Sequence, residues 1–462
     1  MDQNQVLNKK EKIAADFREE IKHAFEPDGK VMSADRELRY CLEKQRDRMN
    51  KRNLTCVDEM IHRGSFPNGL NRVRSWKDEH YDTSWTVDYI NHKKTFKREG
   101  MRTYKFRQKQ SIYETVVDVR NGVDVSEDTY CCPNCGWISK IRELEEGCSH
   151  CNTSFKMSEL YPKISNYYFV YDITGKTDNF FLTILKYGLI LYPISLIVIF
   201  IILAYQKNLS FADFLLNPQM IIVGLIVSVI MIPAFGFAGF MYSVFWDFFR
   251  LACRDLPILF AVITARSKFA SRMSKLCPEF TFEYFTSRMV SLFKILVFSD
   301  NREELPFYSG RDLGNELDNI VDVSFLGSMS CRSVKEKDNM VYVTADIFVD
   351  NARDLGRKIK VKNDIYRIKA GRRLDIPFST NFSISKIHCR TCGGSFDAFK
   401  SNICPYCGNK YEPETNDWVI YDVRNVGFQT AVFRIITEIA VIAVVALSFL
   451  VLFLEMTGRI TI

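Results

Sequence analysis

The chain has 462 residues, of which 47% are hydrophobic and 25% are charged, and its formal net charge is +7. This length accommodates two soluble domains and several membrane segments, and so mild a basicity excludes any argument for a nucleic-acid partner from bulk charge alone. Most of the fourteen cysteines occur in Cys-x2-Cys pairs. That spacing is typical of zinc sites rather than of disulfide frameworks, so we expect the thiols to face a reducing compartment.

Segment 1–30 has the pattern of an amphipathic helix, with apolar residues mostly four apart between charged ones and no apolar stretch of signal-peptide type. This helix either docks on its own domain, which we favour, or binds a partner. Segment 31–130 follows as a first α+β module. Helix is expected across 34–62, and strands at Thr95–Phe106 and Ser111–Val119.

Two segments, 131–174 and 389–424, each carry two Cys-x2-Cys pairs about a dozen residues apart, which is the spacing of a zinc ribbon. Four thiolates complete a tetrahedral site and leave no position for water, so we expect two structural zinc ions. The predicted ligands are Cys132, Cys135, Cys148 and Cys151 in the first ribbon and Cys389, Cys392, Cys404 and Cys407 in the second. Cys131, His150 and His388 adjoin these ligands and are the weaker alternatives.

The two ribbons belong to an internal repeat. Each leads into the pattern Asn-x-aromatic-apolar-apolar-Tyr-Asp-apolar, at Asn166–Ile173 and again at Asn416–Val423, and each is then followed by an apolar run. Internal repeats define domain boundaries, so the chain is expected to use one plan twice.

Three apolar runs, at 180–206, 219–246 and 433–454, predict transmembrane helices, because about 20 residues of helix cross a hydrocarbon core of about 30 Å. The basic segment 247–278 places the exit of the second helix on the cytosolic side. Within it, Leu256–Ala265 either lies among the lipid headgroups or continues the second span. We therefore predict an integral membrane protein, in the plasma membrane if bacterial, with its N-terminus and both ribbons cytosolic and its C-terminus outside.

Segment 279–388 predicts a second soluble module of helices followed by a meander. A helix is expected at Phe280–Val297 and a shorter one at Asp312–Ile320. The expected strands are Val321–Met329, Met340–Val349 and Lys358–Lys369. The fold class is thus α+β with membrane helices, comprising two soluble helix-plus-meander modules, two zinc ribbons and three transmembrane helices.

A basic run lies on the last predicted strands of this module. It is interpreted as a solvated sheet edge, as a contact for acidic headgroups, or as a surface for RNA or an acidic protein. Its members are Arg357, Lys358, Lys360, Lys362, Arg367, Lys369, Arg372 and Arg373.

The part from 280 to 423 resembles the bacterial, zinc-ribbon-bearing branch of the Tim-forty-four-like family. The resemblance lies in the helix Glu283–Phe298, the turn Leu305–Ser309, the meander, the cysteine pairs with Gly393 and Gly408 after them, and Asp417-Trp-Val419. It implies a cone-shaped domain similar to nuclear transport factor two, acting at a membrane without performing a reaction. The implied pocket inside the cone is lined from Phe285, Met289, Phe293, Val323, Phe325, Val343 and Phe348.

The sequence contains no nucleophile elbow, no phosphate-binding loop of the Walker type, no His-Glu-x-x-His and no dinucleotide fingerprint. We therefore predict a non-enzymatic membrane scaffold or tether whose ribbons recruit a protein partner in protein transport or membrane-protein assembly, in contact with anionic lipid. One alternative is a membrane receptor for a ribosome or nucleic acid. The other is a small-ligand carrier or enzyme that uses the cone pocket.

Overall fold

The computed structural model divides the chain into two compact units, Met1–Asp172 with Ala261–Ala431, and Ile173–Phe260 with Val432–Ile462. Each unit is described by itself. The structure describes residues 3–63, 75–77, 80–135, 137–171, 180–206, 217–250, 256–277, 280–305, 307–375, 386–388, 391–392, 395–397, 403–404, 406–410 and 418–427.

The first unit begins with two helices and an antiparallel sheet. The helices are α1 (Gln3–His23) and α2 (Arg36–Lys51). The sheet has the order β1-β3-β4-β7, with β2 pairing with β3. Its strands are β1 (Thr55–His62), β2 (Ser75–Lys77), β3 (Tyr81–Lys97), β4 (Tyr104–Val119) and β7 (Lys163–Tyr171). The first cysteine ribbon, inserted between β4 and β7, contains β5 (Thr129–Cys131), β6 (Ile138–Lys140), α3 (Ile141–Glu146) and α4 (Met157–Leu160).

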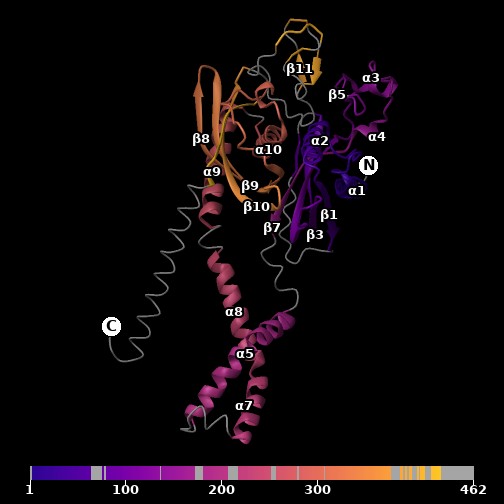
Figure 1. Ribbon diagram of the computed structural model, residues 1–462. Coiled ribbons are helices and arrows are strands. Elements are labelled where there is room, and N and C mark those ends of the chain that lie inside the picture. Colours follow the sequence, from indigo (N-terminus) through magenta and orange to yellow (C-terminus); the bar gives the residue numbers. More distant parts are fainter. Residues whose placement is uncertain are drawn as a thin grey trace. The chain divides into compact units, whose positions relative to one another are not determined.

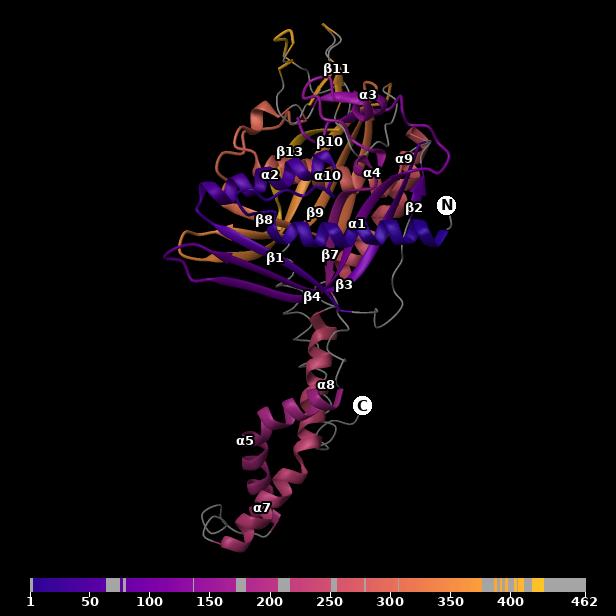
Figure 2. The same ribbon diagram turned by 90° about the vertical axis from the view of Figure 1, so that its right-hand side faces the viewer.

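Helix α1 lies across the strands of this sheet (Figure 2) and covers one of its faces. The apolar stripe of the helix, which includes Phe17 and Ile21, is buried in a core shared with the sheet. Polar contacts hold the same face. The Arg18 guanidinium lies 2.5 Å from Glu114 and 3.2 Å from Asp88.

The expectation of helix across 34–62 is wrong in its second half. Helix α2 ends at Lys51, Asn53 follows with a φ of 52°, and Thr55–His62 forms β1. Asparagine tolerates this left-handed conformation, which ends the helix. The strand Thr95–Phe106 is also wrong, because that stretch contains the turn of the β3–β4 hairpin.

A second antiparallel sheet of the first unit has the order β13-β10-β9-β8. Its strands are β8 (Ile320–Lys337), β9 (Met340–Asp354), β10 (Ile359–Arg373) and β13 (Val419–Asn425). The helices before it are α9 (Leu256–Leu276), which begins in the second unit, and α10 (Phe282–Phe298), followed by a 3-10 turn at Arg302–Glu304. The second ribbon, between β10 and β13, contains β11 (Lys386–His388) and β12 (Ser395–Asp397). The mixed α+β class with two antiparallel sheets is confirmed.

Helix α10 lies beside the strands of this sheet (Figure 1), and most of its side chains are buried in the core. Phe285 meets Trp418 of the β13 segment at a ring distance of 4.9 Å, and Phe293 meets Tyr366 of β10 at 4.8 Å. The predicted helix at Asp312–Ile320 is wrong. Those residues form consecutive turns that lead into β8, with Gly314 at a φ of 46°.

The two sheets repeat one topology, in which three meandering strands are followed by an inserted ribbon and a fourth strand at the edge. In each sheet the fourth strand has a one-residue bulge against the third, at Ser165 in β7 and at Tyr421 in β13. Each fourth strand also forms a parallel bridge to a segment of its own half, Ala34 to Ile164 and Tyr308 to Ile420.

The sequence match at Asn166 and Asn416 is out of register with these bulges. Asn166 follows the bulge of β7, whereas Asn416 precedes that of β13 and lies outside the described residues. The repeat is therefore a repeat of topology more than of residue positions.

Buried polar contacts join the two halves of the first unit. Lys94 Nζ of β3 lies 2.8 Å from Asp58 Oδ2 of β1 and 2.9 Å from Asp322 Oδ2 of β8. Gln45 Nε2 of α2 donates to Asp322 Oδ1 at 2.8 Å. On another helix pair, Arg288 of α10 forms an ion pair with Glu37 of α2.

The described part of the second unit consists of apolar helices. They are α5 (Phe180–Gln206), α7 (Pro218–Ile230) and α8 (Ile232–Arg250). Glycines allow α5 and α8 to cross closely, since a Cβ on Gly188 would lie 2.6 Å from the carbonyl oxygen of Ile232. Gly236 lies in the same way against the carbonyl oxygen of Ile184. Small residues are typical of closely packed helices.

The predicted single-helix spans are corrected in this unit. Among the described residues no one helix is both long and apolar enough to cross a membrane. Ile221–Ile230 and Ile232–Met241 satisfy the requirement only as a pair, bent by 46° at Met231, and Phe181–Pro193 is a shorter apolar helix. Pro233 explains the break, because proline lacks an amide hydrogen and clashes with the preceding turn. The predicted span 433–454 lies outside the described residues.

Candidate metal centre

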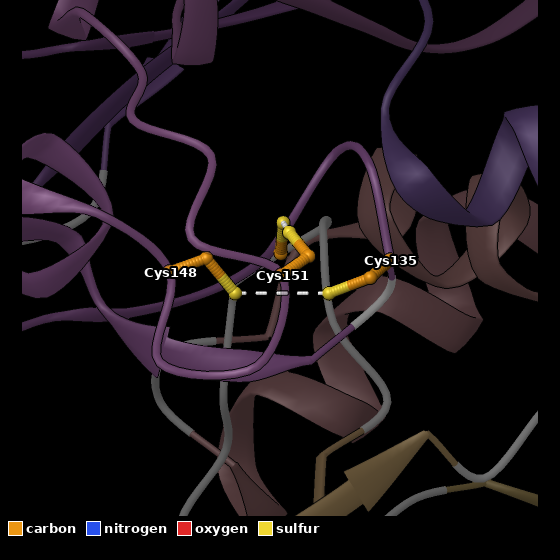
Figure 3. Close-up of side chains that lie close together, drawn as sticks. Cys135, Cys148 and Cys151 are labelled. Atoms are coloured by element: carbon orange, nitrogen blue, oxygen red, sulfur yellow. Dashed lines mark hydrogen bonds between the residues drawn. The ribbon is translucent and has the colours of Figure 1, made fainter.

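The first cysteine cluster is formed by two tight turns that face each other. Cys132 and Cys135 occupy the turn between β5 and β6, and Cys148 and Cys151 occupy the turn after α3. The four sulfurs all lie within 4.8 Å of one another. Cys132 Sγ is 3.7 Å from Cys151 Sγ, and Cys135 Sγ is 3.6 Å from Cys148 Sγ. In Figure 3 the sulfurs of Cys135 and Cys148 point toward each other from opposite loops.

The backbone of each turn explains why the two-residue spacing produces convergent sulfurs. The Cys132 amide donates to the Trp137 carbonyl at 2.7 Å, and the Cys148 amide donates to the Thr153 carbonyl at 3.0 Å. Asn152, which follows the last cysteine, has a φ of 57°. The chain must turn left-handed at that position to close the loop, which asparagine tolerates.

Hydrogen bonding and burial act in opposite directions on these thiols. Hydrogen bonds with the Thr153 side chain and backbone lower the pKa of Cys151 to about 6. Burial raises the pKa of Cys135 well above the ordinary thiol value. Since only the thiolate ligates a metal, binding releases the protons that burial otherwise retains. The four sulfurs could hold a metal ion.

The second cluster contains Cys392, Cys404 and Cys407, whose sulfurs also lie within 4.8 Å of one another. Cys392 Sγ is 3.7 Å from Cys404 Sγ. The fourth predicted ligand, Cys389, lies outside the described residues. Three of the four predicted positions are therefore brought together, and they too could hold a metal ion.

The same turn geometry recurs in this second cluster. The Cys404 amide donates to the Asn409 carbonyl at 2.9 Å, as the first residue of each pair does in the first ribbon. Gly408, which follows Cys407, has a φ of 73°. In both ribbons an asparagine amide then reaches a threonine hydroxyl across the site, Asn409 to Thr391 at 2.7 Å and Asn134 to Thr153 at 3.0 Å.

The two ribbons contact each other through aromatic side chains. Trp137 of the first ribbon meets Tyr406 of the second edge to face, with ring centroids 5.4 Å apart. Trp137 also stacks on the ring of His150 at 5.3 Å. Sequence reasoning missed this contact. Its only sequence signal is an aromatic residue within or beside a cysteine pair of each ribbon.

Of the weaker ligand alternatives, His150 stacks on Trp137 and belongs to no cysteine cluster in the described part of the chain. The side chains of Cys131 and His388 lie outside what the structure describes.

The implied cone pocket is filled by the domain's own side chains. Phe285, Met289, Phe293, Val323, Phe325 and Val343 are all buried in the core around α10. The prediction is wrong for Phe348, which alternates on β9 with the buried Ile347 and Val349 and is itself half-buried outside this core. Two cavities lie elsewhere in the first unit, and both are lined largely by polar residues. One of about 530 Å³ includes Arg353 and Tyr366, and one of about 660 Å³ includes Arg48 and Asp318. Neither is the apolar pocket that the resemblance implies.

The basic run is partly neutralised. Arg367 pairs with Asp346 at 2.8 Å, and Arg373 pairs with Asp375. Arg372 is buried. Arg357, Lys358 and Lys360 remain exposed at the β9–β10 turn.

The fold and site define an α+β protein with two cysteine ribbons, in which four and three described cysteines converge. No family model, no curated protein and no solved structure matches the chain.

Proposed function

We propose that this protein is a non-enzymatic membrane scaffold in which two structural zinc ions fix a pair of ribbons as one docking surface for a protein partner. The contact between Trp137 and Tyr406 carries the proposal. Through this contact the two ribbons, which are far apart in the sequence, form one surface.

Zinc is the metal that suits these ligands best. Four thiolates at about 2.3 Å from a tetrahedral zinc ion lie about 3.8 Å apart, close to the sulfur separations of 3.6 and 3.7 Å in the two clusters. A site with four protein ligands has no open position for water or substrate. The ions therefore stabilise the fold and carry out no hydrolysis.

The second ribbon exposes apolar side chains beside this contact. Tyr406 is 45% exposed and Ile403 is 49% exposed. Aromatic residues in such positions are enriched where proteins bind one another. A partner that covers Tyr406 and Ile403 also contacts Trp137 and therefore binds both ribbons at once.

Membrane attachment rests on the second unit. Many of its described large apolar side chains are exposed on α5, α7 and α8, for example Phe181 at 85% and Ile230 at 68%. Contiguous exposed apolar surface is typical of sites that contact lipid or another protein. The finer proposal retains three membrane segments, with the ribbons cytosolic and the C-terminus outside, and a cone-shaped second module of the Tim-forty-four-like kind.

Photo-crosslinking of the full chain in cells tests the partner surface. A photoreactive amino acid replaces Tyr406, and in the control it replaces Tyr342 of β9, which is similarly exposed at 38%. We expect a discrete protein adduct from position 406 alone. Equal adducts from both positions, or none from 406, would contradict the docking surface.

Alkaline carbonate extraction of the same cells tests the membrane part separately. A membrane-embedded chain stays in the pellet with the lipid. Release of the full-length chain into the supernatant would contradict membrane integration and leave the docking surface untouched.

A further inference from the structure

The first sheet has two faces of different chemistry. One face carries Ile90, His92, Lys94, Phe96 and Ile112, all of them buried. Because side chains alternate along a strand, the residues between these positions form the opposite face, which we call the outer face. Its described members are Val57, Glu59 and Ile61 of β1, Trp85, Val87, Tyr89, Asn91, Lys93, Thr95 and Lys97 of β3, Lys105, Arg107, Lys109, Ser111 and Tyr113 of β4, and Tyr168 and Val170 of β7.

Three aromatic rings gather at one end of the outer face. Tyr113 and Tyr168 are paired across β4 and β7, and their rings stack at 5.0 Å with an angle of 3°. Trp85 meets each of them edge to face at 5.8 Å. All three side chains are only half-buried, and Val170 beside them is exposed. This cluster is an aromatic platform, and its Tyr168 ring also packs edge to face on Phe325 of β8 at 5.7 Å.

Cations continue from this platform along β4. Lys105, Arg107 and Lys109 occupy alternate positions, so their Cα atoms lie about 7 Å apart along the strand. Lys93 of β3 is paired directly with Arg107. Lys105 and Arg107 are exposed and form no ion pair within the described part of the chain. Glu59, bound to Lys93 at 2.7 Å, is the single carboxylate among the described residues of the outer face.

The basic row extends past the end of the hairpin. Arg98, beside the β3–β4 turn, donates from both terminal nitrogens to the Asp354 carboxylate at 2.7 and 3.0 Å. Asp354 ends β9, and the next turn carries the exposed Arg357 and Lys358. Two basic segments that are far apart in the sequence are thus brought to adjoining hairpin tips.

We propose that the outer face binds single-stranded nucleic acid, with bases on the Trp85 and Tyr113 rings of the platform and the phosphate backbone along Lys105 and Arg107. Aromatic rings stack on the faces of unpaired bases, and cations along a strand follow the phosphates. An acidic lipid surface would pair with the lysine and arginine side chains, but it would not account for the aromatic rings. A duplex offers no open base faces for them. This site is separate from the ribbons and independent of the partner proposed there.

The test measures binding of a fluorescein-labelled, unstructured 20-nucleotide RNA to the purified full chain in uncharged detergent, by fluorescence anisotropy. We expect Tyr113→Leu to weaken binding about tenfold, the usual effect of losing one stacked base, and Tyr113→Phe to keep near-normal affinity. Arg107→Glu should weaken binding and also flatten its dependence on salt, by about 0.7 in the logarithmic slope for each lost phosphate contact. Lys337→Glu makes the same charge change at the exposed β8–β9 turn and should change affinity less than twofold.

Each variant is compared with the parent for melting temperature and metal content, so that misfolding is not mistaken for lost contact. Equal affinity of Tyr113→Leu and the parent would overturn the proposal, because it leaves only a charged surface. So would equal loss with Arg107→Glu and Lys337→Glu. Binding to vesicles containing phosphatidylglycerol together with no binding of the RNA would assign the face to lipid and overturn it as well.

Discussion

Lys94 provides a sensitive test of how the two sheets are joined. Its ammonium contacts Asp58 and Asp322 while its side chain is 6% exposed. Burial alone lowers the pKa of Lys94, but the attraction of Asp322 and Asp58 outweighs burial and holds that pKa well above its ordinary value. Lys94→Met therefore leaves two carboxylates without their shared cation in a buried site.

The expected cost follows from what remains around those carboxylates. Removing one partner of a buried pair costs about 3 to 5 kcal/mol. Asp58 keeps His92 at 2.6 Å and Asp322 keeps Gln45 at 2.8 Å, so we expect the lower end, about 3 kcal/mol. At about 2 to 4 °C for each kcal/mol, the melting temperature should fall by roughly 6 to 12 °C.

The neighbouring residue is a matched control. Lys93→Met removes an ion pair with Glu59 of similar length, 2.7 Å, but that lysine side chain is 35% exposed. Such exposed pairs contribute at most about 1 kcal/mol. Thermal unfolding of both variants, followed by near-ultraviolet circular dichroism, distinguishes the two cases. Equal melting temperatures for Lys94→Met and Lys93→Met would refute the claim that the buried network joins the sheets.

Three further predictions concern titration, a glycine and the metal. Burial raises the pKa of Glu114 to about 7, so the folded state favours the acid form of this side chain. The free energy of unfolding should therefore fall by up to about 3 kcal/mol from pH 4.5 to 7, and urea unfolding of Glu114→Gln should lack that decline. Gly327→Ala should lower the free energy of unfolding by about 2 kcal/mol, because its φ is +71° and a Cβ would lie 2.9 Å from the Tyr168 ring. Gly356→Ala has open space around the new Cβ and should lower it by only about 1 kcal/mol. Equal losses in the two variants would contradict the close approach of Gly327 to Tyr168. Cys148→Ser should reduce zinc, measured by mass spectrometry after dialysis, from two ions per chain to one, and two retained ions would contradict a metal site that requires Cys148.

The cysteine clusters could be predicted because the signal is local. A Cys-x2-Cys pair on a tight turn brings two sulfurs together regardless of the rest of the fold, and the structure brings together every described predicted ligand. The alternation of helices with a meander was also recognisable, since the period of apolar residues changes from helix to strand. The mixed α+β class followed from it.

Local signals failed where a boundary depends on one residue. The polar sequence of Thr55–His62 resembles a continuation of helix α2, and the left-handed turn at Asn53 ends the helix before the strand β1 begins. A long hairpin such as β3–β4 is equally hard to place, because its turn lies within a run of similar residues. The apolar run at 219–246 was predicted as one helix, and its apolar pattern does not indicate that α7 and α8 are bent at Met231.

The sequence did not identify the partners in long-range contacts. Lys94 and Asp322 lie on different sheets, and nothing in a strand pattern identifies the partner of a buried lysine. The same holds for Trp137 and Tyr406 between the ribbons. The platform of Trp85, Tyr113 and Tyr168 depends on strand register, which only the folded sheet supplies.

The parallel bridges of Ala34 to Ile164 and of Tyr308 to Ile420 have a consequence for self-association. A strand at the end of a sheet offers unpaired amides and carbonyls to any passing chain. In each half of the first unit, a short segment of the same half pairs with the edge strand at one position. At these two positions the bridging segments therefore occupy part of each sheet edge and make the addition of a strand from another chain less favourable.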